Sequence, residues 1–154
     1  MTDQPVTDQP AGTETGIEPL LVSQHVAAPP ETVFDFLVEP DKVIRWLGAA
    51  IDIEAKPGGV FWMDANGTDI ASGHYHEVVR PDRVVFTFGW EASPHVPAGS
   101  TTVTITLEAM GDGTTTVHLR HDGLPKGPAD DHRHGWTHYL GRLAELFNPT
   151  ASGT

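Results

Sequence analysis

The spacing of hydrophobic residues changes along the chain, and each change predicts a different kind of element. The apolar run 20–27 favours a β-strand, which the pair Pro29-Pro30 brings to an end. Hydrophobic residues then recur at helical spacing after Pro30, a residue that suits the first turn of a helix. A second short helix is predicted over 40–47 and ends at Gly48. The chain therefore begins with one strand and two short helices.

From Ala50 onward the hydrophobic period becomes two, which is typical of strands with one buried face. Turn signals rich in glycine, proline and asparagine divide this stretch into about six strands. They are 57–59 (PGG), 66–67 (NG), 81–82 (PD) and 111–113 (GDG). The last element is a long helix, whose apolar stripe consists of Trp136, Leu140, Leu143 and Phe147. Separate groups of strands and helices favour an α+β fold with an antiparallel sheet.

A curved sheet covered by a single long helix leaves an internal space, and the two periods indicate which side chains border it. The positions expected to point inward are Phe61, Met63, Phe86, Phe88, Trp136 and Leu140. Ordinary core packing accounts for most apolar stripes of this kind. A cavity wall is the functional alternative, because Met63 and aromatic rings suit an adaptable apolar ligand.

Composition narrows the class of protein. The 154 residues fit one domain, which we expect to span 17–147, and the segments 1–16 and 148–154 are predicted as disordered tails. There are 9 Lys and Arg against 21 Asp and Glu, and the net charge of −12 argues against nucleic acid or an acidic membrane as partner. The chain has no cysteine, which excludes disulfides and thiolate chemistry. Without a long apolar run or a basic leader, we expect a cytoplasmic protein with no membrane span.

Five short segments occur in an order that resembles a known family. They are 28–34 (APPETVF), 57–61 (PGGVF), 73–84 (GHYHEVVRPDRV), 116–124 (TVHLRHDGL) and 135–143 (GWTHYLGRL). Together they resemble the SRPBCC (START/birch-pollen-allergen-like) superfamily and, within it, the family named for homology to the activator of the heat-shock-protein-90 ATPase. The resemblance covers about 20–147. It implies the helix-grip fold, in which a curved antiparallel sheet wraps the last helix around a cavity for a small, largely apolar molecule.

Three polar residues are candidates for chemistry in that cavity. Tyr75 and Glu77 share a strand face, and the family pattern implies that this face points inward. Glu77 would then be a general base beside Tyr75 as donor, or a carboxylate held by a structural hydrogen bond. His121 ends an apolar face, where it would contact a polar ligand group, act as acid or base, or serve as a satisfied core histidine.

A metal site is not expected. His134 and His138 are four residues apart on the predicted last helix, which is a spacing that metal ligands use. The glutamate that follows the first histidine of a zinc-binding helix is missing, however, because Gly135 stands there. We therefore predict no metal and no cofactor.

Three functions remain open on the sequence. The first is binding of a small hydrophobic or amphipathic ligand, lipids included, between the sheet and the last helix. The second is an enzyme similar to polyketide cyclases or aromatases of the superfamily, with Glu77, Tyr75 and His121 as base, donor and orienting group. The third is a co-chaperone-like interaction with heat-shock protein 90. A homodimer formed through an exposed sheet edge is a further option.

Overall fold

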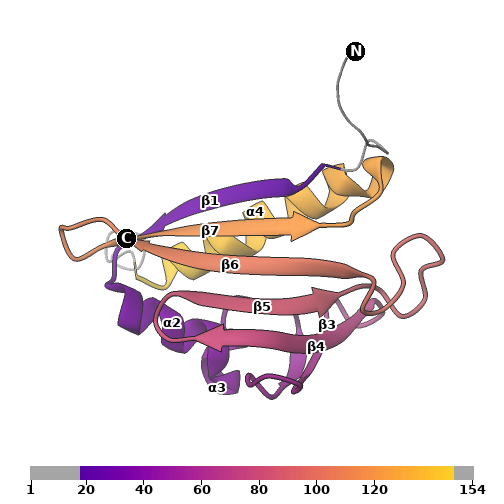
Figure 1. The fold of residues 1–154 in the computed structure, drawn as a ribbon, viewed down its shortest axis with the longest axis horizontal. Helices are drawn as coiled ribbons and strands as arrows, with labels where there is room; N and C mark the ends of the chain where they lie inside the picture. The colour runs from indigo at the N-terminus through magenta and orange to yellow at the C-terminus, as the bar shows by residue number, and fades with distance from the viewer. Residues whose placement is uncertain (1–17, 148–154) are drawn as a thin grey trace, which may run out of the picture.

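The structure, a computed structural model, describes residues 18–147, and the predicted tails 1–16 and 148–154 lie outside this range. These described residues form one strand, two short helices, six strands and one long helix (Figure 1). In chain order they are β1 (Leu20–Val26), α2 (Pro30–Val38), α3 (Pro40–Val43), β2 (Ala50–Ile53), β3 (Val60–Asp64), β4 (Ile70–Val79), β5 (Arg83–Phe88), β6 (Thr101–Ala109), β7 (Thr115–Asp122) and α4 (Lys126–Glu145).

All seven strands belong to one antiparallel sheet with the order β1-β7-β6-β5-β4-β3-β2. The long helix α4 runs behind this sheet in Figure 1, while α2 and α3 lie together at one end of it. The α+β, helix-grip architecture predicted from the sequence is thereby confirmed. No helix within 18–147 combines the length and the apolarity that crossing a membrane requires.

The sheet has one dry face because its strands alternate apolar and polar residues. On β6 the side chains of Val103, Ile105 and Leu107 are buried, while the intervening threonines stay partly exposed. The apolar stripe of α4 meets this dry face: Trp136 is 3% exposed, and Leu140 is fully buried. The hydrophobic core therefore lies between sheet and helix, where burial of apolar surface stabilises both.

Two polar contacts fix the short helices, the first between α2 and the segment after α3, the second between α2 and one end of the sheet. The indole Nε1 of Trp46 donates to the carbonyl oxygen of Phe36 at 2.7 Å, in a buried position. The guanidinium of Arg80, in the turn between β4 and β5, pairs with the α2 carboxylate of Asp35 at 2.9 Å. The end of the sheet where β5 begins is thus closed by α2, and the opposite end, where β5 stops, is free for a pocket.

Candidate functional site

A pocket of about 290 Å³ lies between the middle of α4 and the end of the sheet where β5 stops. Its walls come from β3, from the end of β5 and the segment just beyond it, and from α4. The lining residues are Met63, Phe88, Trp90, Asp131, His132, Gly135, Trp136 and Tyr139. Asp131 is exposed, which places it at the mouth. The lining that the structure describes is thus mostly aromatic, and the Asp131 carboxylate lies at the entrance.

Three of the predicted cavity residues, Met63, Phe88 and Trp136, line this pocket. Phe61, Phe86 and Leu140 are buried as well, but they fill the core beside the pocket and do not border it. The rings of Phe61 and Phe86 stack with their centroids 4.4 Å apart, which leaves no room between them for a ligand. Tyr75 belongs to the same core group, since it is 3% exposed and its burial raises the pKa of its hydroxyl.

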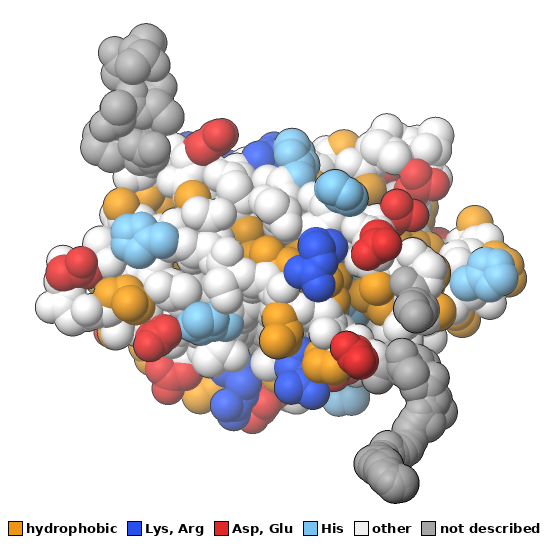
Figure 2. All heavy atoms as spheres, turned by 90° about the horizontal axis from the view of Figure 1, so that it is seen from above, with side chains coloured by type: hydrophobic (Ala, Val, Ile, Leu, Met, Phe, Trp, Pro, Cys, Tyr) orange, Lys and Arg blue, Asp and Glu red, His pale blue; other side chains and the backbone are white. Residues whose placement is uncertain are grey.

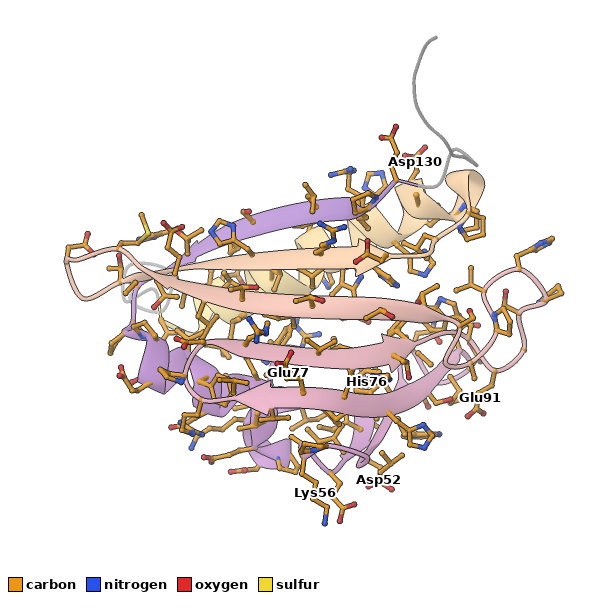
Figure 3. All side chains as sticks on the ribbon, viewed as in Figure 1. Asp52, Lys56, His76, Glu77, Glu91 and Asp130 are labelled. Atoms are coloured by element: carbon orange, nitrogen blue, oxygen red, sulfur yellow. The ribbon has the colours of Figure 1, made fainter. Side chains whose placement is uncertain are left out.

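Glu77 does not point inward, and the expectation that it shares a face with Tyr75 is wrong. The pairing of β4 with β5 shifts between Tyr75 and Glu77, where a β-bulge adds one residue to β4. The bulge turns Glu77 to the face of the sheet opposite α4 (Figure 3). There Arg83 donates two hydrogen bonds to its carboxylate, at 3.0 and 2.9 Å. These bonds lower the pKa of Glu77, so it is a charged, surface-paired group.

His121 lies behind the pocket wall, at the centre of a buried chain of hydrogen bonds. The Nε1 of Trp136 donates to its Nδ1 at 3.0 Å, so the imidazole proton is on Nε2. Nε2 then donates to the hydroxyl of Thr101 at 2.8 Å, and that hydroxyl donates to the carbonyl of Phe88. Both ring nitrogens are therefore occupied, and the histidine links α4 to three strands.

Burial also decides the charge of His121. The desolvation of its ring, with a smaller contribution from the nearby His132, lowers its pKa to about 3. At neutral pH the imidazole is uncharged and has no free nitrogen to offer a ligand. The geometry thus favours the alternative in which His121 is a satisfied core histidine.

A second hydrogen-bonded pair, which no sequence pattern predicted, borders the pocket itself. The Nε1 of Trp90 donates to the Nε2 of His132 at 2.8 Å. The Nδ1 of His132 donates in turn to the carbonyl oxygen of Pro128, one helical turn earlier, at 2.8 Å. This pair ties the segment after β5 to α4 and holds the Trp90 indole as a wall of the pocket.

The three residues considered for catalysis do not meet in one cavity. Glu77 is on the outer face, and neither Tyr75 nor His121 borders the pocket. His134 and His138 are exposed on α4 and are not part of its lining either. Across residues 18–147, no three His, Asp or Glu side chains are grouped so that they could hold a metal ion. The arrangement offers shape and an apolar surface, with no assembled acid–base pair.

Comparison with known proteins places the chain among relatives of this architecture. Residues 27–148 match the family described as activator of Hsp90 ATPase homolog 1-like protein. An AHSA1-like protein from Rhizobium etli, solved in solution, is 40% identical with a TM-score of 0.63, and the match covers 84% of this chain and 82% of that one. No protein with curated annotation matches the chain.

More distant structures share the fold alone. DynU16, from the dynemicin biosynthetic locus, is 23% identical with a TM-score of 0.72; the match covers 82% of this chain but only 46% of DynU16. The Aha1 dimer from Colwellia psychrerythraea is 16% identical with a TM-score of 0.71, covering 84% of this chain and 96% of that one. That protein is a dimer; for the present chain a homodimer stays a prediction.

Proposed function

The chain belongs to the family of activator of Hsp90 ATPase homolog 1-like proteins, and we propose that it binds a small hydrophobic or amphipathic molecule in the pocket between sheet and α4. The observation that carries this proposal is the wall of the pocket, where four aromatic side chains and Met63 surround open space. An apolar ligand placed there would remove its own surface and the surface of these rings from water. This burial is favourable by a free energy of roughly 25 cal/mol per Å² of apolar surface. Concave, mostly apolar sites with few polar groups are the usual form of small-molecule sites.

The size of the pocket narrows the ligand. Its volume of about 290 Å³ is at the lower end of the range of roughly 300–1,000 Å³ that small-molecule sites occupy. A molecule with one or two rings suits this volume better than a lipid with long acyl chains. Within the proposal, the ligand is therefore a compact molecule.

The presence of a glycine at position 135, inside α4, also supports the proposal. A glycine inside a helix costs about 1 kcal/mol relative to alanine, so its presence in α4 is unfavourable for the helix alone. It lines the pocket, and a Cβ at this position would meet no other atom within 4 Å. The missing side chain thus leaves space that a ligand can use.

Replacing Gly135 with leucine is expected to fill the pocket and weaken binding by about tenfold or more. The probe is 2-naphthol, added to the full ¹⁵N-labelled chain and followed by the indole N–H signals of its tryptophans. The signals of Trp90 and Trp136 should shift with the wild type. Those of Trp46 and Trp62, which do not line the pocket, should stay in place.

The matched control is Gly141→Leu, since Gly141 is also on α4, also has open space at its Cβ, and does not line the pocket. It should bind 2-naphthol as the wild type does. The proposal is overturned if Gly135→Leu binds with unchanged affinity. It is also overturned if the Trp90 and Trp136 signals move neither with 2-naphthol nor with a positively charged, a neutral or an anionic benzyl compound.

The cyclase-like alternative has no specific observation in its favour, because Glu77 is paired with Arg83 on the outer face. Glu77→Gln is therefore expected to leave the affinity for 2-naphthol unchanged, since the substitution lies outside the pocket. The same titration measures it. A loss of affinity comparable to that of Gly135→Leu would show that Glu77 reaches the ligand, contrary to its position on the sheet.

The co-chaperone-like alternative would require a contiguous exposed apolar patch. The large hydrophobic side chains that are exposed among residues 18–147 are Leu21, Val60, Val79 and Met110. They belong to β1, β3, β4 and the segment after β6, so they do not come from one element. On the face drawn in Figure 2, hydrophobic side chains are interspersed with charged and polar ones. The described surface therefore favours the pocket over a docking patch.

A further inference from the structure

The hydrogen-bond donors in the pocket wall are already used by the protein. The Nε1–H of Trp90 is donated to His132, and the Nε1–H of Trp136 is donated to His121. His132 has no free nitrogen, because its Nδ1 donates to the carbonyl of Pro128 while its Nε2 accepts from Trp90. A ligand in the pocket consequently finds no unoccupied N–H group on these three side chains.

The polar groups that remain in the wall are the carboxylate of Asp131 and the hydroxyl of Tyr139. Among the side chains that the structure describes, no Lys or Arg belongs to the lining. Two arginines of α4 have their guanidinium groups engaged elsewhere: Arg133 donates to the carbonyl of Leu21, and Arg142 donates to that of Arg45. The described lining therefore combines aromatic rings with a negative charge at the mouth and contains no positive group to balance an anion.

We propose that the ligand of this pocket is a hydrophobic organic cation, such as an aromatic amine or a quaternary ammonium compound. This inference rests on the binding function proposed above. A cation is attracted to the faces of aromatic rings, and the Asp131 carboxylate at the mouth adds to that attraction. A fatty acid or another carboxylate would meet Asp131 with like charge and only one hydroxyl donor. The net charge of −12 also raises the local concentration of cations at the protein surface.

Three probes that share a benzyl group test the charge preference on the full chain. Benzyltrimethylammonium carries a positive charge, neopentylbenzene is its neutral counterpart of the same shape, and phenylacetate is anionic. Binding is followed through the indole signals of Trp90 and Trp136. We expect the cation to bind about fivefold tighter than the neutral compound or better, and phenylacetate to bind more weakly than both.

A pair of substitutions on α4 tests the role of Asp131. Asp131→Asn is expected to weaken benzyltrimethylammonium binding by about three- to fivefold and to leave neopentylbenzene unaffected. Asp130→Asn is the matched control, because it removes the same charge from a neighbouring exposed residue that does not line the pocket (Figure 3). It should change the affinity for either compound by less than about twofold.

The outcomes separate this inference from the binding function on which it rests. If neopentylbenzene or phenylacetate binds as tightly as the cation, or if Asp131→Asn has no effect on the cation, the charge preference is overturned while the pocket keeps its binding function. If none of the three probes and no 2-naphthol binds, the binding function itself is overturned.

Discussion

Between pH 6.5 and pH 4 the protein is expected to lose about 3 kcal/mol of its unfolding free energy through one side chain, His121. Burial lowers the pKa of His121 from 6.5 to about 3 in the folded chain. In this window the unfolded chain binds a proton at His121 and the folded chain does not. The stability contributed by the neutral ring is therefore fully present above pH 6.5 and is lost as the pH falls toward 3.

The hydrogen bonds of His121 explain why its ring does not bind this proton in the folded chain. Protonation would place a second N–H on Nδ1, directly against the Nε1–H of Trp136, where a bond of 3.0 Å now exists. Two donors would then oppose each other in a site from which water is excluded. The His132 ring lies only 5.4 Å away between centroids, and a charge on it would repel a charged His121 further.

The variant His121→Gln separates the effect of the imidazole from that of the other titrating groups. Its amide offers an oxygen acceptor and an N–H donor in place of the two ring nitrogens, but it does not titrate. We expect lower stability than the wild type at pH 7, and a shallower decline toward pH 4. Urea unfolding followed by tryptophan fluorescence at pH 7, 5 and 4 measures both.

The control is His134→Gln, which removes an exposed imidazole from α4 and should keep the pH dependence of the wild type. Equal slopes for the wild type and His121→Gln would mean that His121 does not resist protonation in the fold.

Much of the fold could be predicted because one-sided burial forces a regular pattern on the sequence. On β6 the alternation of Val103, Ile105 and Leu107 with threonines follows directly from a sheet with one dry face. The stripe that begins at Trp136 similarly identified the face of α4 that packs on the sheet. Patterns of this kind depend only on neighbours along the chain, so they can be recognised without knowing the tertiary structure.

The position of Glu77 could not be predicted in the same way. A period of two assigns residues to faces only while the strand stays regular, and a single inserted residue exchanges the faces from that point on. Tyr75, before the bulge, is inside as expected, and Glu77, after it, is outside. The bulge lies within 73–79 (GHYHEVV), and no proline, asparagine or glycine stands at the bulge itself. The sequence of this segment is therefore that of an uninterrupted strand.

The distinction between core and pocket also required the tertiary structure. Phe61 and Phe88 have the same inward position on their strands, yet only Phe88 borders the pocket. Phe61 stacks on Phe86 in the core, whereas Phe88 packs against Trp90. The Trp90 indole is in turn held by a hydrogen bond to His132, which lies 42 positions away in the sequence. Nothing in the residues around Trp90 or around His132 indicates that the two side chains meet. The sequence therefore predicted an apolar, aromatic pocket wall but not all of the residues that form it.

The second large effect is expected at Gly89, where alanine should destabilise the fold by about 3 kcal/mol and remove the binding of 2-naphthol. A Cβ on Gly89 would overlap the carbonyl oxygen of Pro97 and would lie 2.9 Å from the Cα of Ala98. Both are backbone atoms, so no side chain can rotate away to make room. The clash has to be relieved by moving the loop that follows Trp90.

That movement would reach the pocket, because Gly89 stands between two of its lining residues, Phe88 and Trp90. The loop is held by a hydrogen bond of 2.7 Å from the backbone N–H of Trp90 to the carbonyl of Val96. Pushing Pro97 outward strains this bond and draws the Trp90 indole away from His132. In the ¹⁵N spectrum, the indole signal of Trp90 should therefore shift even without ligand, while that of Trp46 should not.

The control for Gly89→Ala is Gly141→Ala, whose Cβ would meet no atom within 4 Å. Because alanine is the better helix former, this control should raise stability by up to about 1 kcal/mol. Urea unfolding at pH 7 compares the two variants with the wild type. If Gly89→Ala is as stable as the wild type and keeps the Trp90 signal in place, the loop adjusts freely and does not position the wall of the pocket.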